Sequence, residues 1–140
     1  MIEYHDSAEN FTAEQLVGFF VGWPNPPSQD THLEILRRSF SVCVATDTET
    51  GRVVGFGTAV SDGVLAAYLP LLEVLPEFQQ RGIGTTVAQR LLNRLRDLYM
   101  VDLVCDPKLA PFYERLGMRA GSAMTLRRYD RQAADNDALR

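Results

Sequence analysis

The sequence predicts a single α/β domain built around one mixed β-sheet, and two observations predict it. Short apolar runs separated by turn residues occupy positions 40–75, which indicates antiparallel strands. An apolar strand, a helix-patterned run and a second apolar strand follow between residues 64 and 105, an order typical of a parallel crossover. The chain has 140 residues, enough for one domain with a core and too few for two, so we expect residues 1–130 to form it.

The N-terminal region is expected to hold a strand, a helix and an irregular loop. Ile2–His5 is the expected first strand. Thr12–Gln15 has the spacing of a capping box. Apolar residues follow it at helical intervals, at Leu16, Phe19 and Phe20. This helix should stop before Gly22–Pro27, because three prolines and a glycine favour an irregular loop.

A second helix and three antiparallel strands are expected next. Thr31–Glu34 has the spacing of another capping box, which predicts a helix that runs to about Ser39. The strands are expected at Phe40–Ala45, Val53–Val60 and Val64–Leu75. Turn residues separate them at Asp47–Gly51 and Ser61–Gly63.

The second half of the chain should begin with a helix over Val87–Leu98. Its buried face is expected to be formed by Val87, Leu91, Leu92, Leu95 and Leu98. Met100–Cys105 is a nearly continuous apolar run, as expected for a strand that is covered on both faces. A short helix is expected over Ala110–Leu116, and Ser122–Tyr129 alternates like a final strand. Residues 131–140 are polar and are expected to form a flexible C-terminal tail.

Composition argues against several classes of protein. The net charge is −4, which disfavours a general nucleic-acid binder because such proteins show a basic face. No apolar run reaches the ~20 residues of a membrane span, and the first residues lack the pattern of a signal peptide. Cys43 and Cys105 lie in apolar strand-like runs, so we expect buried free thiols and a cytoplasmic protein. His5 and His32 lie far apart, and no Cys/His cluster has the spacing of a metal site.

The most informative segment is the one between the apolar strand and the helix. Gly82 and Gly84 stand where free backbone N–H groups and the helix dipole favour an anion. Glycine allows positive φ and leaves no Cβ between the backbone and a phosphate. Arg81 adds a charged donor, while Thr85 and Thr86 can cap the helix or donate to phosphate oxygens. The alternative is that the two glycines only make a tight turn.

Two familiar phosphate-binding loops do not fit this segment. A P-loop ends in Gly-Lys-Ser/Thr, whereas Gly84 is followed by Thr85 and the only lysine is Lys108. A Rossmann fingerprint needs a third glycine where this chain has Val87, and a strand that ends at the first glycine. The loop is therefore expected to be of another kind.

The pattern Val74-x-Pro76-x-x-Gln79-x-x-Gly82-x-Gly84 resembles the acetyl-CoA signature of the GNAT superfamily of N-acetyltransferases. A second pattern, Phe112-Tyr113-x-x-x-Gly117, is similar to a later region of the same family. Together the matches span roughly residues 69–119, about a third of the chain. The N-terminal third resembles the family only in the order of its elements.

The resemblance implies the GNAT-like acyl-CoA N-acyltransferase fold, with acetyl-CoA as acetyl donor and no metal. Its mixed sheet is splayed at the strand before the glycine loop and is flanked by about four helices. The backbone of Leu72–Leu75 would hold the pantetheine arm, and the Val74 N–H would polarise the thioester carbonyl. The implied cofactor-binding residues are Leu72, Val74, Leu75, Gln79, Gln80, Arg81, Gly82, Ile83, Gly84, Thr85, Thr86 and Tyr113.

The implied reaction is direct attack of a primary amine on the thioester. By the resemblance, Tyr113 is the general acid that protonates the departing CoA thiolate. The alternative is that its ring packs and its hydroxyl bonds locally. Cys105 as an acyl-carrying nucleophile is disfavoured, because it lies in an apolar run with no base evident beside it.

Glu73 is the candidate general base. It is a carboxylate in an apolar strand beside the expected acetyl position, so it must face a cleft or find a partner. It would take the amine's proton directly or through water, or attract a cationic substrate. A solvated or salt-bridged carboxylate is the alternative, and the resemblance does not decide because family members differ in where their base lies.

The acceptor pocket should involve the first two helices and the loop between them. Trp23, His32 and Glu73 are the candidate substrate residues, with structural packing as the other role open to Trp23. The acceptor is expected to be a small-molecule or peptide amine. A CoA-binding regulatory or sensor domain without turnover is the alternative function, and an interaction module that binds no cofactor is a third. GNAT proteins are often dimers, which leaves a homodimer open.

Overall fold

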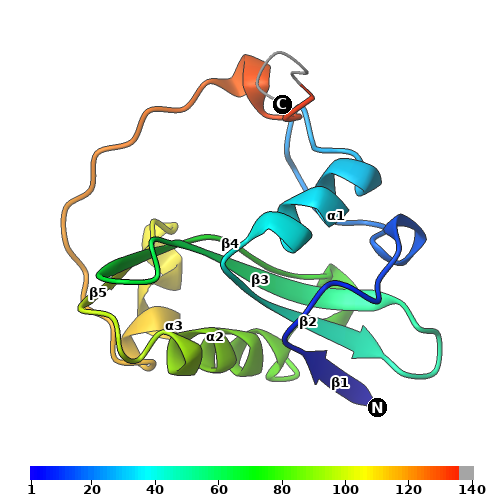
Figure 1. Cartoon of the computed structure of the whole chain (residues 1–140), viewed down its shortest axis with the longest axis horizontal. Helices are drawn as coiled ribbons and strands as arrows, with labels where there is room; N and C mark the ends of the chain where they lie inside the picture. The colour runs from blue at the N-terminus through cyan, green and yellow to red at the C-terminus, as the bar shows by residue number, and fades with distance from the viewer. Residues whose placement is uncertain (136–140) are drawn as a thin grey trace.

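One five-stranded mixed sheet forms the centre of the protein, in the order β1-β2-β3-β4-β5. The computed structural model describes residues 1–135. The strands are β1 (Ile2–His5), β2 (Ser41–Asp47), β3 (Val53–Ser61), β4 (Ala66–Val74) and β5 (Met100–Asp102). Neighbouring strands are antiparallel up to β4, and β4 pairs with β5 in parallel (Figure 1). The mixed sheet that the sequence predicts is confirmed.

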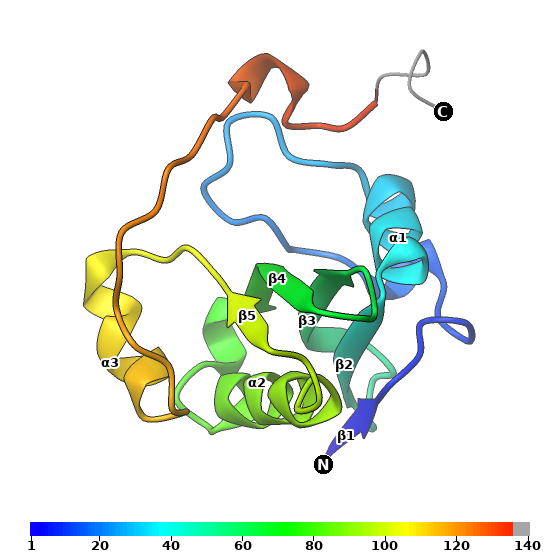
Figure 2. The same ribbon diagram turned by 60° about the vertical axis from the view of Figure 1, so that its left-hand side comes forward.

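Helices cover both faces of this sheet. The helix α2 (Ile83–Arg94) lies across one face, and α1 (Gln29–Arg38) lies across the other (Figures 1 and 2). A short helix, α3 (Ala110–Glu114), lies beyond β5 at the side of the sheet. The described chain is therefore a three-layer α/β/α arrangement.

The middle of β2, residues 42–45, is continuously apolar, and both faces of the strand are covered there. Val42 and Val44 pack on one side in a cluster that includes Leu36 of α1. Cys43 and Ala45 point the other way, into the cluster beneath α2. Successive side chains of a strand alternate between faces, so each residue of this run reaches one core or the other.

The helix expected after Thr12–Gln15 is wrong. Only a 3-10 turn, Ala13–Gln15, forms there, although the Thr12 N–H donates to Gln15 Oε1 at 2.9 Å as in a capping box. Gly18 and Phe20 have φ of 96° and 63°, values that an α-helix does not accommodate. Leu16 and Phe20 are nevertheless buried. The apolar spacing therefore marks a loop that faces the core, not a helix.

Both long helices begin earlier than the sequence predicts. The cap of α1 is Ser28, whose Oγ accepts the Thr31 N–H at 3.1 Å, so the helix begins at Gln29. The helix α2 begins at Ile83 instead of position 87, because Gly82 has a φ of 81° that turns the chain directly into the helix. It also ends earlier, at Arg94 instead of position 98.

The C-terminal region departs most from expectation. The strand β5 is only three residues long, and residues 103–105 leave the ladder. The expected burial on both faces is wrong, because β5 is an edge strand and Met100, Asp102 and Val104 are exposed. The helix α3 ends at Glu114 instead of Leu116. Ser122–Tyr129, expected as a strand, pairs with no strand of residues 1–135, because this segment arcs away from the sheet (Figure 1). Residues 136–140 of the expected tail lie outside the described residues.

No helix within residues 1–135 is long and apolar enough to cross a membrane. The same part of the chain contains no group of three His, Cys, Asp or Glu residues placed to hold a metal ion. Both cysteines are free thiols, and Cys43 is buried as expected. Cys105 is only half-buried, because residues 103–105 leave the β4–β5 ladder.

Candidate active site

The chain leaves β4 through a 3-10 turn, Pro76–Phe78, and an exposed bend before it enters α2. Gln80 and Gly82 have positive φ of 64° and 81° in this bend. Thr86 donates both its N–H and its hydroxyl to the Gly82 carbonyl at 3.1 Å. The N–H groups of residues 83–85 precede that first helical bond and point out of the helix end. With the helix dipole they suit an anion such as a phosphate.

Side chains hold the bend in shape. Gln79 Nε2 donates to the Val74 carbonyl at 3.0 Å. Arg81 donates to the Glu77 carbonyl at 3.1 Å, and its guanidinium lies 5.0 Å from the centre of the Phe78 ring. Gln79 and Arg81 therefore stabilise the loop from within, and backbone N–H groups are the donors left free at the end of α2.

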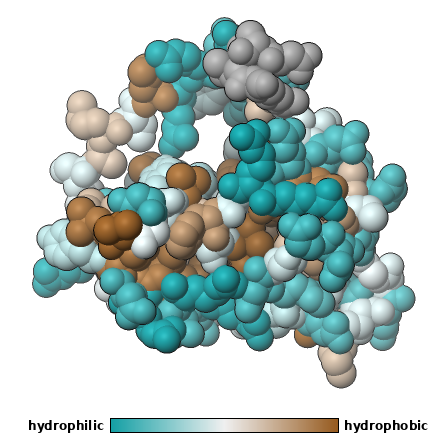
Figure 3. Space-filling model, in the orientation of Figure 1, coloured by the Kyte–Doolittle hydropathy of each residue, from teal (hydrophilic) through white to brown (hydrophobic). Residues whose placement is uncertain are grey.

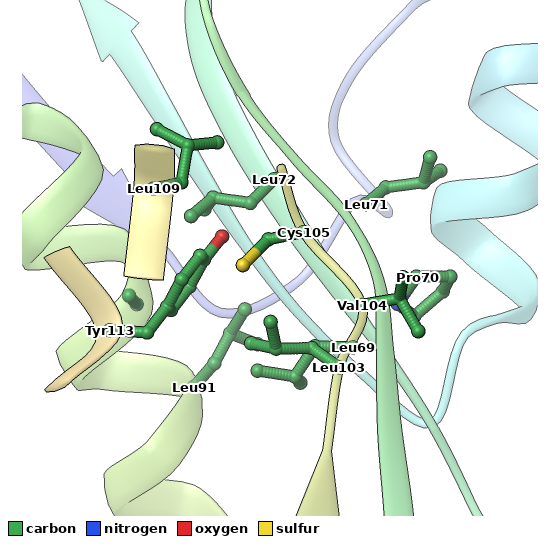
Figure 4. A pocket seen from close by; sticks show the side chains of 11 residues that line it. Leu69, Pro70, Leu71, Leu72, Leu91, Leu103, Val104, Cys105, Leu109 and Tyr113 are labelled. Carbon is green, nitrogen blue, oxygen red and sulfur yellow. The ribbon is translucent and has the colours of Figure 1, made fainter. Parts of the chain in front are cut away.

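The strands β4 and β5 separate beyond a short parallel ladder. Only Ala66, Ala67 and Tyr68 pair with β5, at Met100, Val101 and Asp102. The strands then diverge around a cavity of about 140 Å³ (Figure 4). Its lining consists of Leu69, Pro70, Leu71, Leu72, Ala88, Leu91, Leu103, Val104, Cys105, Leu109 and Tyr113. The splay of the sheet before the glycine loop is thus confirmed.

The register of β4 leaves a backbone donor free at this opening. The Leu75 N–H donates to the Val54 carbonyl of β3 at 2.9 Å. Adjacent residues of a strand present their N–H and C=O groups to opposite edges, so those of Val74 face the open edge of β4, two residues beyond Leu72 of the cavity wall. The Val74 carbonyl accepts its hydrogen bond from the Gln79 side chain, in agreement with that direction. Val74 therefore offers its N–H to a ligand, whereas Leu75 does not.

Tyr113 reaches the cavity from α3. Figure 4 shows its hydroxyl pointing between Cys105 and Leu72, and its ring packs edge-on against Phe112 with centroids 4.9 Å apart. Burial, and secondarily the neighbouring Cys105, raise the pKa of Tyr113 above its ordinary value. The hydroxyl consequently keeps its proton at neutral pH. Tyr113 is therefore a neutral O–H donor in an apolar cavity.

Glu73 projects from β4 on the face opposite to Leu72 and Val74, as strand alternation predicts. Its Oε1 accepts the Phe20 N–H at 2.9 Å and its Oε2 accepts the Val21 N–H at 3.2 Å. Within residues 1–135 it forms no ion pair. Glu73 thus finds its partners in two backbone N–H groups. These hydrogen bonds hold the loop of Phe20 and Val21 against β4.

Trp23 and His32 meet at the same loop, around Phe20. The rings of Trp23 and His32 each lie 4.8 Å from the Phe20 ring. His32 is 1% exposed, and its Nε2 has no hydrogen-bond partner within residues 1–135. Burial lowers the pKa of His32 to about 4, so the ring is neutral at pH 7. Neither side chain lines the cavity beside Tyr113; with Glu73 they form a cluster on the other face of β4.

The model of the Acetyltransferase (GNAT) family matches residues 8–118, which is most of the chain. The chain belongs to the GNAT acetyltransferase family. The resemblance carried by the glycine loop and the Phe112-Tyr113 segment is therefore confirmed. The splayed strands and the helix α2 border the cavity, and the glycine bend leads into α2.

Solved GNAT structures share this fold. The crystal structure of a putative acetyltransferase from Deinococcus radiodurans R1 is 49% identical, and the match covers 94% of this chain and 92% of that one at a TM-score of 0.91. A GNAT acetyltransferase from Streptococcus pneumoniae TIGR4 is 25% identical, with a TM-score of 0.73 over 91% of this chain and 99% of that one. A match over 94% is more than residues 1–118 can supply, so the first alignment includes part of the segment after α3.

Curated GNAT relatives are longer than this chain. GCN5-related N-acetyltransferase 3, chloroplastic, of Arabidopsis thaliana is 36% identical over 80 residues, which are 56% of this chain and 34% of that protein. An uncharacterized N-acetyltransferase, ycf52, of Porphyra purpurea is 28% identical over 100 residues, 69% of this chain and 58% of that protein. The matched part is thus between a third and three-fifths of these relatives.

Sequence reasoning missed two parts of the GNAT site. The first is the cavity wall formed by β4 before Leu72 and by the residues after β5, including Leu109. The apolar run Met100–Cys105 was its available signal, because it is longer than the ladder that β5 makes. The second is Phe20, whose N–H binds Glu73 and whose ring contacts His32. No sequence signal marks the positive φ that places Phe20 there.

His32 is expected to make the stability of this GNAT domain fall on acidification. Its pKa is about 4 in the folded protein, against an ordinary 6.5. As pH falls below 6.5 the unfolded chain binds a proton that the folded protein excludes, so stability is lost between the two values. The loss by pH 4 is up to about 3 kcal/mol, since one unit of pKa corresponds to about 1.4 kcal/mol. Urea unfolding at neutral pH and near pH 4 measures it.

A His32→Phe variant should lose less stability than the natural chain over the same range, because an uncharged ring has no proton to exclude. His5→Phe is the matched control, since His5 is half-exposed and should leave the difference intact. Identical acid losses for the natural chain and His32→Phe would contradict the role assigned to His32.

Proposed function

We propose that this chain is an acetyl-CoA-dependent N-acetyltransferase that moves the acetyl group to a primary amine by direct attack. The observation that carries the proposal is the free Val74 N–H where β4 and β5 separate, with the Tyr113 hydroxyl in the adjoining cavity. Aminolysis of a thioester needs a hydrogen-bond donor for the oxyanion and a proton donor for the leaving thiolate. Membership of the GNAT family supports this class of chemistry.

Acetyl-CoA would bind with its pyrophosphate at the glycine bend and its pantetheine arm along β4. The N–H groups of residues 83–85 are the phosphate donors, and Gln80 and Thr85 flank them. No atom lies within 4 Å of the position that a Cβ would take on Gly82, so the backbone there is open to a ligand. The N–H groups of Leu72 and Val74 face the same edge of β4 and would pair with the pantetheine and the acetyl carbonyl.

In the proposed reaction a neutral amine attacks the carbonyl carbon, and the Val74 N–H donates a hydrogen bond to the oxyanion that forms. The C–S bond then breaks, and Tyr113 gives its phenolic proton to the sulfur of CoA. The raised pKa of Tyr113 keeps that proton in place until the thiolate develops. The proton of the amine leaves through water or through Glu73, and a proton from solvent restores the Tyr113 hydroxyl.

Glu73 is proposed to organise the acceptor side of the site. Its two oxygens hold the N–H groups of Phe20 and Val21, and this loop continues to Trp23. Each carboxylate oxygen has a second lone pair, so Glu73 can also attract a cationic amine or receive its proton. We assign the acceptor, a small-molecule or peptide amine, to the space beside this loop.

Gly82→Val is expected to weaken acetyl-CoA binding at least tenfold. A β-branched residue at a φ of 81° is strained, and its side chain would occupy the open space over the bend. Tenfold is about 1.4 kcal/mol, in reach of one lost phosphate contact. Isothermal titration calorimetry with acetyl-CoA measures the change directly.

The matched control is Gly51→Val. Gly51 has a φ of 73° and open space around its Cβ position, but it lies in the turn between β2 and β3 and is not part of the glycine bend. It should carry the same backbone strain and keep full affinity. Equal affinity in Gly82→Val and the natural chain would remove the glycine bend from the donor site.

A measurement of turnover distinguishes an enzyme from the alternative, a CoA-binding regulatory or sensor domain that does not catalyse the reaction. Free thiol release from acetyl-CoA should rise when suitable amines from a panel of polyamines, amino acids, aminoglycosides and peptides are added. Binding of acetyl-CoA with only slow, amine-independent hydrolysis across that panel would favour the regulatory domain.

A further inference from the structure

An arm, residues 119–128, leaves the protein after α3 and returns beside the loop that carries Trp23. Figures 1 and 2 show it bowing outward, and Figure 3 shows open space between it and the body. Every residue of the arm is exposed, and Met124 and Leu126 are 98% and 75% exposed. Uncovered large apolar side chains at alternate positions of one segment indicate a surface that is buried elsewhere.

The backbone of the arm is unpaired along its length. Within the described chain, residues 119–127 neither donate nor accept a hydrogen bond. The two ends are held: the Met118 N–H donates to the Tyr113 carbonyl at 3.2 Å, and Asn25 Nδ2 donates to the Tyr129 carbonyl at 3.1 Å. The arm therefore presents a row of free N–H and C=O groups of the kind that recruits another strand.

The outer edge of β5 is complementary to this arm. β5 ends the sheet, so its outer backbone groups have no strand beside them within residues 1–135. Apolar side chains lie partly exposed on β5 and just beyond its end, with Met100 at 38% and Val104, which also borders the cavity, at 43%. The opposite edge, β1, carries Glu3 and His5 instead, and charge of this kind discourages pairing.

We propose that two copies of this chain exchange arms, so that residues 120–128 of each pair as a β-strand with β5 of the other. The arm does not pair with β5 of its own chain while its ends stay at α3 and at Asn25, because its middle bows away from the sheet. A second copy has the same β5 edge and the same arm, so a dimer with one two-fold axis pairs each arm with the β5 edge of the other copy. Main-chain pairing provides affinity, and the alternate apolar side chains add contact.

The exchanged strand would run beside the active-site cavity. Leu103, Val104 and Cys105 continue from β5 and line that cavity. A strand added at β5 would therefore place residues of a second copy against the outside of the cavity wall. The dimer would then shape the active site as well as stabilise the fold.

The mass of the full chain in solution is the first test. Light scattering after size exclusion should give twice the 15.7 kDa of one chain. Thr125→Pro removes a backbone donor from the arm, and Leu126→Lys places a charge on its apolar face. Both should give monomers that are still folded by circular dichroism, because both residues are exposed and residues 119–127 form no hydrogen bond within their own subunit.

Val17→Lys is the matched control, since Val17 is also an exposed apolar residue, at 47%, and lies next to Arg52 at the turn between β2 and β3. It should remain a dimer. A natural chain that is monomeric throughout the micromolar range would overturn the proposal, and so would a dimer that persists in both arm variants.

Disulfide cross-linking tests whose β5 the arm occupies. One chain carries Leu126→Cys and the other Val104→Cys, both on a Cys105→Ser background, and the two are unfolded and refolded together. Mild oxidation should yield a disulfide-linked product of two chains from this mixture. A chain carrying both substitutions that instead cross-links within itself would show that the arm folds back onto its own β5, and the exchange would be wrong; so would no cross-link in either case.

Discussion

Tyr113→Phe is expected to lower kcat about 100-fold while leaving the Kd for acetyl-CoA unchanged. The substitution removes only the hydroxyl, so the ring still packs against Phe112 and still walls the cavity. The departing CoA thiolate then receives no proton from the protein. Steady-state rates with a good amine, together with calorimetric titration of acetyl-CoA, separate the loss of chemistry from a loss of binding.

The direction of the Tyr113 pKa shift also predicts how activity depends on pH. Because burial raises the pKa of Tyr113, the proton-donating form persists above the ordinary value of about 10. The natural enzyme should therefore lose no activity through Tyr113 ionisation at any pH below that value. Tyr99→Phe is the control, since Tyr99 is 83% exposed and should leave kcat as it is. If Tyr113→Phe turns over within twofold of the natural chain, another group protonates the thiolate.

Gly57→Val should destabilise the fold by about 3 kcal/mol or more. A Cβ on Gly57 would lie 2.7 Å from Leu91 Cδ1, 2.9 Å from Val87 Cγ1 and 3.1 Å from Leu72 Cδ1. Gly57 is on a central strand with a neighbour on each side, so its backbone cannot move away. The side chains of Leu91, Val87 and Leu72 must rotate away, or α2 must shift from the sheet. Because Leu91 and Leu72 line the cavity, its shape changes in either case. Chemical unfolding measures the loss in stability.

Gly55 provides a graded comparison on the same strand. A Cβ there would meet Ile83 Cγ2 at 3.1 Å and Val74 Cγ2 at 3.4 Å, which is tight but not a clash. Gly55→Ala should therefore cost clearly less than Gly57→Ala. Equal stabilities for the two alanine variants would mean that the packing of α2 on β3 is looser than these distances require.

The sequence predicted best where local pattern and tertiary packing agree. The apolar run Phe40–Ala45 predicts a strand, and β2 forms over Ser41–Asp47 with Val42 and Cys43 in different cores. The glycine bend was readable because Gly82 needs its positive φ for backbone reasons alone. Tyr113 was found through a motif, although its position in the cavity depends on how far β5 diverges from β4.

The rest depends on contacts that no local pattern records. Leu16 and Phe20 have helical spacing, yet Glu73 on a distant strand binds the Phe20 amide and holds a non-helical loop. The direction of the Val74 N–H follows from a register that the Leu75–Val54 hydrogen bond reveals. Ser122–Tyr129 has the alternation of a strand but lacks a neighbour within its own subunit. Hydrophobic spacing can be read from the sequence, whereas the segment with which a strand or loop pairs cannot.

The two hydrogen bonds that Glu73 accepts from backbone N–H groups bear on how an amine acceptor would bind beside this loop. The same two oxygens that anchor Phe20 and Val21 are the ones an arriving ammonium group would approach. An amine bound there would share these oxygens with the two N–H groups through their remaining lone pairs. Under the proposed function, occupation of the acceptor site would therefore be coupled to the hydrogen bonds that hold this loop on β4, whereas the Leu75 N–H that fixes the donor side is bonded within the sheet.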